Sequence, residues 1–230
     1  MAAGRFPEPD GSVTILPQPS PCYAGVFAFT AHSVVFADAD PAWIRGQLPR
    51  GDLSAPMLPP FLQALCARTG RRVNSIDMLC VAAPLPGPPP VKLSRLSPAP
   101  GALSPAADSL SPGDPAAGSP SPGDPATGPG HPRVARAVRY RDDVRAWQAP
   151  GGVVLVGRGV AGRWEAAIEV DPDDRDRGLG RTLATAARHL VPDGAPLWAQ
   201  IAPGNAASVR AFLAAGFAPV GGEALLLPAG

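Results

Sequence analysis

The sequence is poor in cysteine. Only 3 of its 230 residues are cysteines, Cys22, Cys66 and Cys80, and they are widely spaced with no CxxC pair among them. An odd, scattered set without a nearby histidine pair argues against a disulfide framework or a structural zinc site and suits a reducing compartment. We therefore expect no metal centre, interpret Cys66 and Cys80 as core residues, and predict a cytoplasmic protein.

Net charge and long apolar runs are also lacking. The 20 basic and 19 acidic residues leave a net charge of +1, so no overall field recruits nucleic acid or an anionic membrane. No segment approaches the roughly 20 consecutive apolar residues of a membrane-spanning helix, and the N-terminal residues lack the apolar core of a signal peptide. The sequence therefore predicts a soluble protein with neither a nucleic-acid nor a membrane partner, and any anion must be bound locally.

Proline and glycine, in contrast, are abundant. The 32 prolines and 26 glycines are more than a uniformly packed domain needs. Many of them lie in residues 84–132, in which Ser-Pro-Gly-Asp-Pro-Ala occurs at 111–116 and again at 121–126. This composition predicts a disordered linker, either an inert spacer, which we favour, or a scaffold for a proline-recognising partner. Residues 1–21 are also predicted to be flexible, although 13–16 could pair as a short edge strand.

Two segments, 22–83 and 133–230, have the patterns of packed structure. In the first, we predict strands at 24–30, 33–37 and 76–82 and helices that begin at Asp40-Pro41 and at Phe61. In the second, we predict helices at 179–190 and 206–214, strands at 144–149, 153–157, 164–170 and 196–202, and two last strands on either side of Gly221-Gly222. Residues 134–140 fit a short helix or a strand, and their alanine and arginine content favours the helix. We expect the two segments to form one continuous or paired sheet across the linker.

The most informative stretch is the turn Asp171-Pro-Asp-Asp-Arg-Asp-Arg-Gly-Leu-Gly-Arg-Thr-Leu, between the strand at 164–170 and the helix at 179–190. A strand that runs into a glycine-containing turn and then a helix leaves backbone N–H groups unpaired at the positive end of the helix dipole. Three arginines lie close by in the sequence. The stretch therefore predicts an anion site, most naturally for phosphate.

Two common phosphate loops do not fit this turn. A dinucleotide-binding GxGxxG needs a third glycine where Leu183 stands, and it needs an acidic residue at the end of a second parallel strand about 20 residues further on, which is missing. A P-loop needs a lysine before serine or threonine, and the turn has no lysine. Both loops are excluded by the residues present.

The turn instead resembles motif A of the GNAT superfamily of acyl-CoA-dependent N-acetyltransferases, since Arg175-Asp-Arg-Gly178-Leu-Gly180 matches its pattern R-x-x-G-x-G. Residues 205–217, which begin with Asn205 and end with Gly216-Phe217, resemble motif B of the same superfamily. Two motifs in this order, with a predicted strand between them, are a stronger sign than either alone. The resemblance covers about residues 133–230.

The resemblance implies an α/β (α+β-like) fold, with a mixed, mostly antiparallel twisted sheet flanked by helices. It also implies that acetyl-CoA is bound as the acyl donor in a cleft, where the strand ending at Val170 splays from the strand at 197–202. Segment 22–83 would lie on the acceptor side, and residues 133–230 would form the core that binds acetyl-CoA. The residues implied to contact acetyl-CoA are Val170, Arg175, Arg177, Gly178, Leu179, Gly180, Arg181 and Asn205.

The resemblance implies transfer of the acetyl group to an amine of a small molecule or a peptide, which requires a base for the amine proton. Glu165 and Glu169 lie on one face of the strand at 164–170, which we expect to be exposed, and either could be that base directly or through water. Many members of the superfamily have a tyrosine as general acid where this chain has Phe212. That departure supports a rival hypothesis, a non-catalytic acyl-CoA-binding or regulatory module of the same fold.

Overall fold

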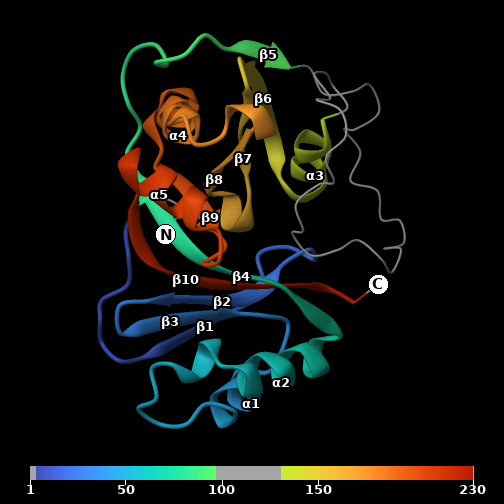
Figure 1. Ribbon diagram of the computed structural model, residues 1–230. Helices are drawn as coiled ribbons and strands as arrows, with labels where there is room; N and C mark the ends of the chain where they lie inside the picture. Colours follow the sequence, from blue (N-terminus) through green and yellow to red (C-terminus); the bar gives the residue numbers. More distant parts are fainter. Residues whose placement is uncertain (1–3, 97–130, 230) are drawn as a thin grey trace.

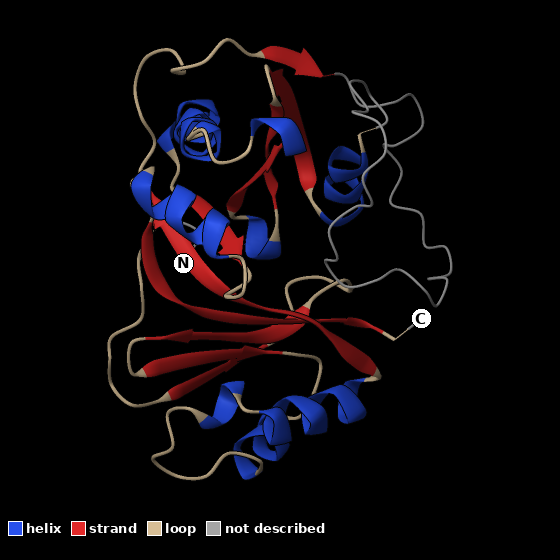
Figure 2. Cartoon of the chain, in the orientation of Figure 1, coloured by secondary structure: helices blue, strands red, loops and turns tan. Residues whose placement is uncertain are grey.

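The computed structural model describes residues 4–96 and 131–229. Its strands in chain order are β1 (Val13–Leu16), β2 (Ala24–Phe29), β3 (His32–Phe36), β4 (Arg71–Ala82), β5 (Ser94–Leu96), β6 (Asp142–Ala149), β7 (Gly152–Arg158), β8 (Trp164–Val170), β9 (Leu197–Ile201) and β10 (Ala218–Pro228). They form one sheet in the order β1-β3-β2-β10-β4-β9-β8-β7-β6-β5, in which every neighbouring pair except β1–β3 and β8–β9 is antiparallel. The predicted mixed, mostly antiparallel sheet is confirmed (Figure 1, Figure 2).

Helices cover both faces of this sheet. They are α1 (Pro41–Gly46), α2 (Pro59–Thr69), α3 (Pro132–Tyr140), α4 (Leu179–Leu190) and α5 (Ala206–Ala214). The α4–α5 pair and the α1–α2 pair lie on the same face of the sheet. Met78 of β4 packs against the α4–α5 cluster, and Gly222 of β10 faces Met57 of the α1–α2 cluster. These two residues are cross-strand partners, so they point to the same side. Helix α3 packs on the opposite face of β6 and β7 through Val134 and Ala137. No helix in the described part of the chain is long and apolar enough to cross a bilayer.

The helix ends follow the signals in the sequence. Asp40 Oδ1 accepts the N–H of Ala42 at 2.9 Å ahead of α1, and Asn205 Oδ1 accepts the N–H of Ser208 at 3.0 Å at the start of α5. Gly70 ends α2 with a φ of +65°. Side-chain caps satisfy N–H groups that a first helical turn leaves unpaired, and glycine enters the left-handed region without a Cβ clash. These predicted ends are confirmed, as is the helix expected at 134–140.

The two packed segments share the sheet by interleaving their strands. The last strand, β10, pairs with β2 on one side and with β4 on the other, and β4 in turn pairs with β9. Both neighbours of β10 therefore come from residues 22–83, although β10 belongs to the C-terminal segment (Figure 1). The continuous sheet that we predicted is confirmed, and neither segment completes its part of the sheet without the other.

Part of the predicted linker is built into the fold. The Leu85 N–H donates to the Arg188 carbonyl at 2.9 Å, Val91 and Leu93 pack against the α4–α5 core, and β5 pairs with β6. We did not predict β5, because a three-residue strand beside a proline-rich run has no recognisable period. The two hexapeptide copies lie outside the described residues. In the segment predicted to be flexible, the short edge strand β1 is confirmed beside β3.

The C-terminal region is one long strand, and our prediction of two strands on either side of Gly221-Gly222 is wrong. Strand β10 continues through both glycines, with a register shift between Pro219 and Gly221. A Cβ at Gly221 would collide with the carbonyl oxygen of Ala28 in β2. Glycine serves here to let two backbones approach closely, and not to form a turn.

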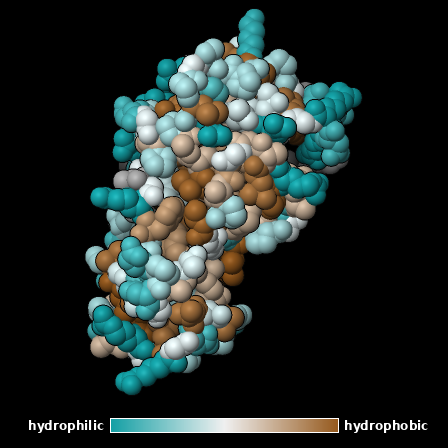
Figure 3. Space-filling model, turned by 90° about the vertical axis from the view of Figure 1, so that its left-hand side faces the viewer, coloured by the Kyte–Doolittle hydropathy of each residue, from teal (hydrophilic) through white to brown (hydrophobic). Residues whose placement is uncertain are grey.

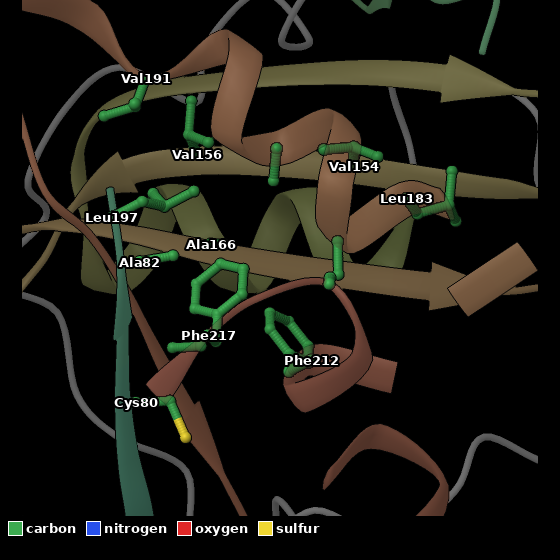
Figure 4. Packing of buried hydrophobic residues seen from close by; sticks show 14 of the residues in the cluster. Cys80, Ala82, Val154, Val156, Ala166, Leu183, Val191, Leu197, Phe212 and Phe217 are labelled. Atoms are coloured by element: carbon green, nitrogen blue, oxygen red, sulfur yellow. The ribbon is translucent and has the colours of Figure 1, made fainter. Parts of the chain in front are cut away.

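Apolar packing between α4, α5 and the sheet forms one of the clusters of the core. Leu183 of α4, Leu197 of β9 and Phe212 of α5 contribute to it (Figure 4), and Cys80 is fully buried there, as predicted. Figure 3 shows the side of the molecule that is on the left in Figure 1, where hydrophobic residues gather across the middle and hydrophilic residues toward both ends. The α4–α5 cluster supports the two strands, β8 and β9, that lead into the predicted site.

The two neighbouring glycines of β10 provide a matched test of the close approach between the β2 and β10 backbones. Replacing Gly221 by alanine forces the β2 and β10 backbones apart, so we expect the free energy of unfolding to fall by about 1–3 kcal/mol. Gly222→Ala is the control, because its Cβ would lie 3.4 Å from Met57 Cε in ordinary contact. Urea denaturation of both variants measures the difference, and equal stabilities would contradict the close approach.

Candidate functional site

The turn after β8 presents backbone donors to open space. A short 3₁₀ helix (Pro172–Asp174) follows β8, and Asp176 and Gly178 then adopt left-handed conformations with φ of +61° and +82°. Gly178 precedes α4, and no side chain of the described residues caps this helix end. The first amides of α4 therefore lack a helical acceptor. A Cβ on Gly178 would meet nothing within 4 Å, so open space adjoins the residue that precedes these amides.

The charges around this turn nearly cancel. Arg177 Nη1 lies 3.3 Å from Asp174 Oδ1, and Arg175 Nε donates to the carbonyl oxygen of Val170 at 3.4 Å. Three arginines (Arg175, Arg177 and Arg181) stand against four aspartates (Asp171, Asp173, Asp174 and Asp176), which gives a net charge of −1 for residues 171–181. Anion binding at this turn therefore depends on the amides and the helix dipole more than on net charge.

Strands β8 and β9 separate soon after they meet. They are parallel neighbours, but the described residues pair at only two positions, Trp164 with Leu197 and Glu165 with Trp198. Beyond this point residues 166–170 pair with β7 and residues 199–201 pair with β4. Over these residues the edges of β8 and β9 that face each other share no described backbone pairing. This is the splay that the resemblance implied.

The predicted acetyl-CoA residues lie at the ends of these two strands. Val170 ends β8, Arg175 to Gly178 lie in the turn after it, and Leu179 to Arg181 form the start of α4. Gly180 is close enough to α5 that its Cβ would lie 3.3 Å from the Cβ of Ala211. Asn205 lies after β9, where its side chain caps α5. Because β8 and β9 are parallel, their carboxyl ends point to the same edge of the sheet, and α4 and α5 both begin there.

The two predicted base candidates have different surroundings, and our expectation that Glu165 is exposed is wrong. Glu169 is partly exposed and accepts a hydrogen bond from Arg133 Nε at 2.6 Å. Glu165 is only 2 % exposed. It accepts from Arg163 Nε at 2.7 Å and from Arg141 Nε at 2.9 Å. The alternation along β8 does place both carboxylates on one face, but two arginines and the neighbouring strands cover that face at Glu165.

Glu165 belongs to a closed set of hydrogen bonds that we call the Arg163 ring. Its members are Arg141, Arg163, Glu165, Gln200 and Glu223. Arg163 Nη2 donates to Glu223, Gln200 Nε2 donates to Glu223 Oε1 at 2.6 Å, and Arg141 Nη2 completes the ring by donating to Gln200 Oε1 at 3.4 Å. Gln200 Nε2 also lies 3.3 Å from Glu165 Oε1. The ring joins β8, β9, β10 and the residue before β6.

The pKa values of the two carboxyl groups of the ring are shifted in opposite directions. Burial raises the pKa of Glu223 to about 7, against the opposing effect of Arg163, and the nearby Glu165 carboxylate raises it further. Burial also acts to raise the pKa of Glu165, but Arg163 and Arg141 together outweigh it and hold that pKa below its usual value. Asp77, the cross-strand partner of Glu223, has its own pKa raised mainly by burial. Glu165 is thus a fully satisfied anion, and Glu223 holds its proton to higher pH.

Sequence reasoning missed Arg163, Gln200 and Glu223. A sequence signal did exist, because Glu223 is a single carboxylate in an otherwise apolar C-terminal run, and a charge in such a run requires a buried partner. The identity of that partner depends on the position of β10 beside β4, which local patterns do not reveal.

Phe212 lies in the core and not on a cleft surface. It is 4 % exposed, and its ring meets that of Phe217 edge-on, with centroids 4.9 Å apart (Figure 4). Leu183 and Ile201 belong to the same cluster. A phenol at this position would place its hydroxyl among apolar side chains, so the local packing explains why an apolar ring is accommodated here.

Two shallow hollows lie elsewhere on the described surface. One, of about 350 Å³, is lined by residues that include Lys92, Gln148 and Asp171, and the other, of about 430 Å³, by residues that include Arg158 and Asp193. Neither is lined by residues 175–181 or by Asn205. Within the described ranges, no three histidine, cysteine, aspartate or glutamate side chains gather as a metal-binding group.

Comparisons with known proteins give distant likenesses. No family model matches the sequence, and no curated protein matches it. Among solved structures, a GCN5-related N-acetyltransferase from Kribbella flavida has a TM-score of 0.41 at 18 % identity, over 74 % of this chain and 65 % of that one. A putative acetyltransferase of the GNAT family from Novosphingobium aromaticivorans has a TM-score of 0.38 at 16 % identity, over 70 % and 69 %. A GCN5-related N-acetyltransferase from Sphaerobacter thermophilus has a TM-score of 0.38 at 14 % identity, over 72 % and 55 %. The chain spans less than two thirds of the length of the Kribbella and Sphaerobacter proteins.

The raised pKa of Glu223 predicts a specific dependence of stability on pH. The folded protein holds one more proton than the unfolded chain between the ordinary value of 4.5 and about 7. The stability that this group contributes therefore falls as the pH rises through that window. We expect the free energy of unfolding of the wild type, minus that of Glu223→Gln, to decrease from pH 4.5 to pH 7. Urea denaturation across this range measures it, and a constant difference would contradict the assignment.

Proposed function

We propose that this protein is an N-acetyltransferase that transfers an acetyl group from acetyl-CoA to an amine of a small molecule or a peptide. The observation that carries the proposal is the divergence of β8 from β9 after two residue pairs, with β8 leading directly into an uncapped helix end. The two sequence motifs fall on this geometry, since Arg175 to Gly180 run from the turn into the start of α4 and Asn205 caps α5. A parallel strand pair that opens toward a phosphate-binding helix end suits a long ligand with a pyrophosphate in its middle.

The parts of acetyl-CoA can be assigned to parts of this site. The pyrophosphate would accept hydrogen bonds from the amides of Leu179, Gly180 and Arg181 at the start of α4. The pantetheine arm would follow the facing edge of β8 over residues 166–170, where amide groups can pair with it as a strand would. The distance from Val170 to Glu165 is about 17 Å at the rise of a strand, a span that an extended pantetheine arm can cover. The thioester would then lie near the point where β8 and β9 meet.

Proton transfer would use groups around that meeting point. Two arginines hold the Glu165 carboxylate and lower its pKa. Its proton affinity is therefore too low for efficient direct abstraction of a proton from an ammonium group. Glu169 is partly exposed and has one arginine partner, so it is the better candidate for a base that acts through water. A backbone N–H on the facing edge of β8 would stabilise the oxyanion. The acceptor amine would approach from the side formed by segment 22–83.

One observation favours the rival function of a non-catalytic acyl-CoA-binding or regulatory module. Phe212 occupies the position at which the resemblance implies an acidic tyrosine, and it is packed against Phe217 inside the core. A thiolate leaving group then has no phenol at position 212 to protonate it. Solvent can serve a thiolate, because thiols are weak acids with pKa values of about 8.5, so an active enzyme remains our first proposal.

Two measurements test the proposal and separate it from the rival. Calorimetric titration with acetyl-CoA should give saturable binding at one site per chain, and the absence of binding would end both hypotheses. An assay of thiol release from acetyl-CoA, with amino acids, polyamines, aminoglycosides and peptides as acceptors, should show turnover with one class of amine. Binding without turnover across this panel would favour the regulatory module.

The near-neutral turn predicts that one aspartate opposes the proposed ligand. Asp174→Asn releases Arg177 from its ion pair and removes a negative charge near the positive end of the α4 dipole. We expect coenzyme A to bind about two- to fivefold more tightly, with the gain reduced at high salt. Asp193→Asn, which makes the same change beyond the other end of α4, is the control and should give no gain. Calorimetric titration at two salt concentrations measures the effect, and equal affinities for all three proteins would contradict it.

A further inference from the structure

The Arg163 ring lies where the two diverging strands still pair. Glu165 is one of the last residues of β8 that pair with β9. The partner of Glu165 on β9 is Trp198. Gln200 lies two residues after Trp198, on the arm of β9 that has already left β8. The ring thus connects the shared part of the two strands to the part that has separated, and Glu223 ties both to β10.

Arg163 makes this connection with a single planar group. Its Nε donates to Glu165 and its Nη2 to Glu223, so one guanidinium spans β8 and β10. The rings of Phe27 and Trp198 lie near it, with centroids 5.0 and 5.5 Å from Cζ. Arg163 itself is 3 % exposed. A planar fork that meets two carboxylates and contacts aromatic rings has few orientations left, and a lysine cannot reproduce it.

The backbone also makes room for the ring. A Cβ at Gly159 would overlap the carboxyl group of Glu165. This glycine lies in the turn between β7 and β8, and its N–H donates to the carbonyl of Arg163 at 2.9 Å. The turn and the ring therefore fix the start of β8 together.

Stability alone does not account for such an arrangement. Two carboxylates and two guanidinium groups are taken from water into a largely buried site, at a desolvation cost that their mutual attraction often fails to recover. A well-packed apolar set of similar volume is commonly as stable. The ring gives instead a fixed geometry, because each member has directional partners on a different strand.

We propose that the Arg163 ring sets the angle at which β8 and β9 diverge, and that Arg163 is thereby a positioning residue for the acyl-donor cleft. Gln200, held by Glu223 and Arg141, keeps the departing arm of β9 directed toward β4 and β10. Without the ring, the facing edges of residues 166–170 and 199–201 can pair further. The part of this inference that concerns acetyl-CoA rests on the proposed function, whereas the part that concerns the strands does not.

A charge-balanced double variant tests the role of the ring. At pH 8, above the raised pKa of Glu223, Arg163→Met with Glu223→Leu removes one charge of each sign and leaves the Arg141–Glu165 pair in place. We expect the thermal unfolding midpoint to stay near that of the wild type, and the affinity for coenzyme A to fall by about tenfold or more, because a binding site is sensitive to small displacements. Arg158→Met with Asp143→Asn, an exposed pair at 3.0 Å, is the matched control and should keep wild-type affinity.

A single conservative variant covers the case in which the double variant does not fold. Arg163→Lys keeps the charge but cannot donate to both carboxylates in the same plane. We expect it to fold and to bind coenzyme A several-fold more weakly. Wild-type affinity in Arg163→Lys, or in a folded double variant, would overturn the proposal for the cleft.

Hydrogen exchange gives a readout that needs no ligand. In the wild type, amides of residues 166–170 and 199–201 that point into the divergence should exchange fast. In the ring variants they should become protected as the strands pair further. Unchanged exchange would overturn the positioning role, whether or not coenzyme A binds. Wild-type protein that binds no coenzyme A would instead refute the proposed function and leave the exchange result to decide the ring.

Discussion

The pairing of β10 with both β2 and β4 is the constraint on which the rest of the structure depends. It places the last strand of the chain between two strands from the first 82 residues. Contacts between residues so far apart in the sequence must overcome the entropy of closing a long loop, which makes this pairing slow compared with the local hairpin of β6 and β7. Once formed, it fixes β4, and β4 supports β9 along the arm that has separated from β8. The divergence at the candidate site is therefore held in part by the N-terminal segment.

The same pairing explains the charged groups in the middle of the sheet. Because β10 lies beside β4, Glu223 faces Asp77 across the strands and meets Arg163, the residue before β8. A carboxylate buried at this depth would be costly alone, and Arg163 can offset that cost only by sharing its guanidinium with Glu165. Arg141 then balances the second carboxylate. Each partner is required by the one before it, so the ring follows from the position of one strand.

The sequence predicts those parts of this structure that are determined locally. The capped helix starts at Asp40 and Asn205, the hairpin of β6 and β7, and the turn around Gly178 follow from neighbouring residues, and all are present. The course of β10 and the burial of Glu165 were predicted wrongly, since both depend on residues that are far apart in the sequence. Gly221 shows the reason clearly: a glycine pair usually indicates a turn, but here the close approach of β2 requires it. Alternation along β8 likewise gave the correct face for Glu165 without showing what covers that face.

One rigid strand links the two halves of the candidate site. Val170, the last residue of β8, leads into the turn before α4, and the Arg163 ring holds the other end of β8 at Glu165, about 17 Å from Val170 at the rise of a strand. Between them β8 is paired with β7 along its whole length, so these two points cannot shift relative to each other without breaking the β7–β8 ladder. The second wall, β9, is paired with β4 over residues 197–201, and Gln200 also joins it to the ring. The width of the divergence therefore depends on two restraints on β9, the β4 ladder and the ring, and both lead to β10.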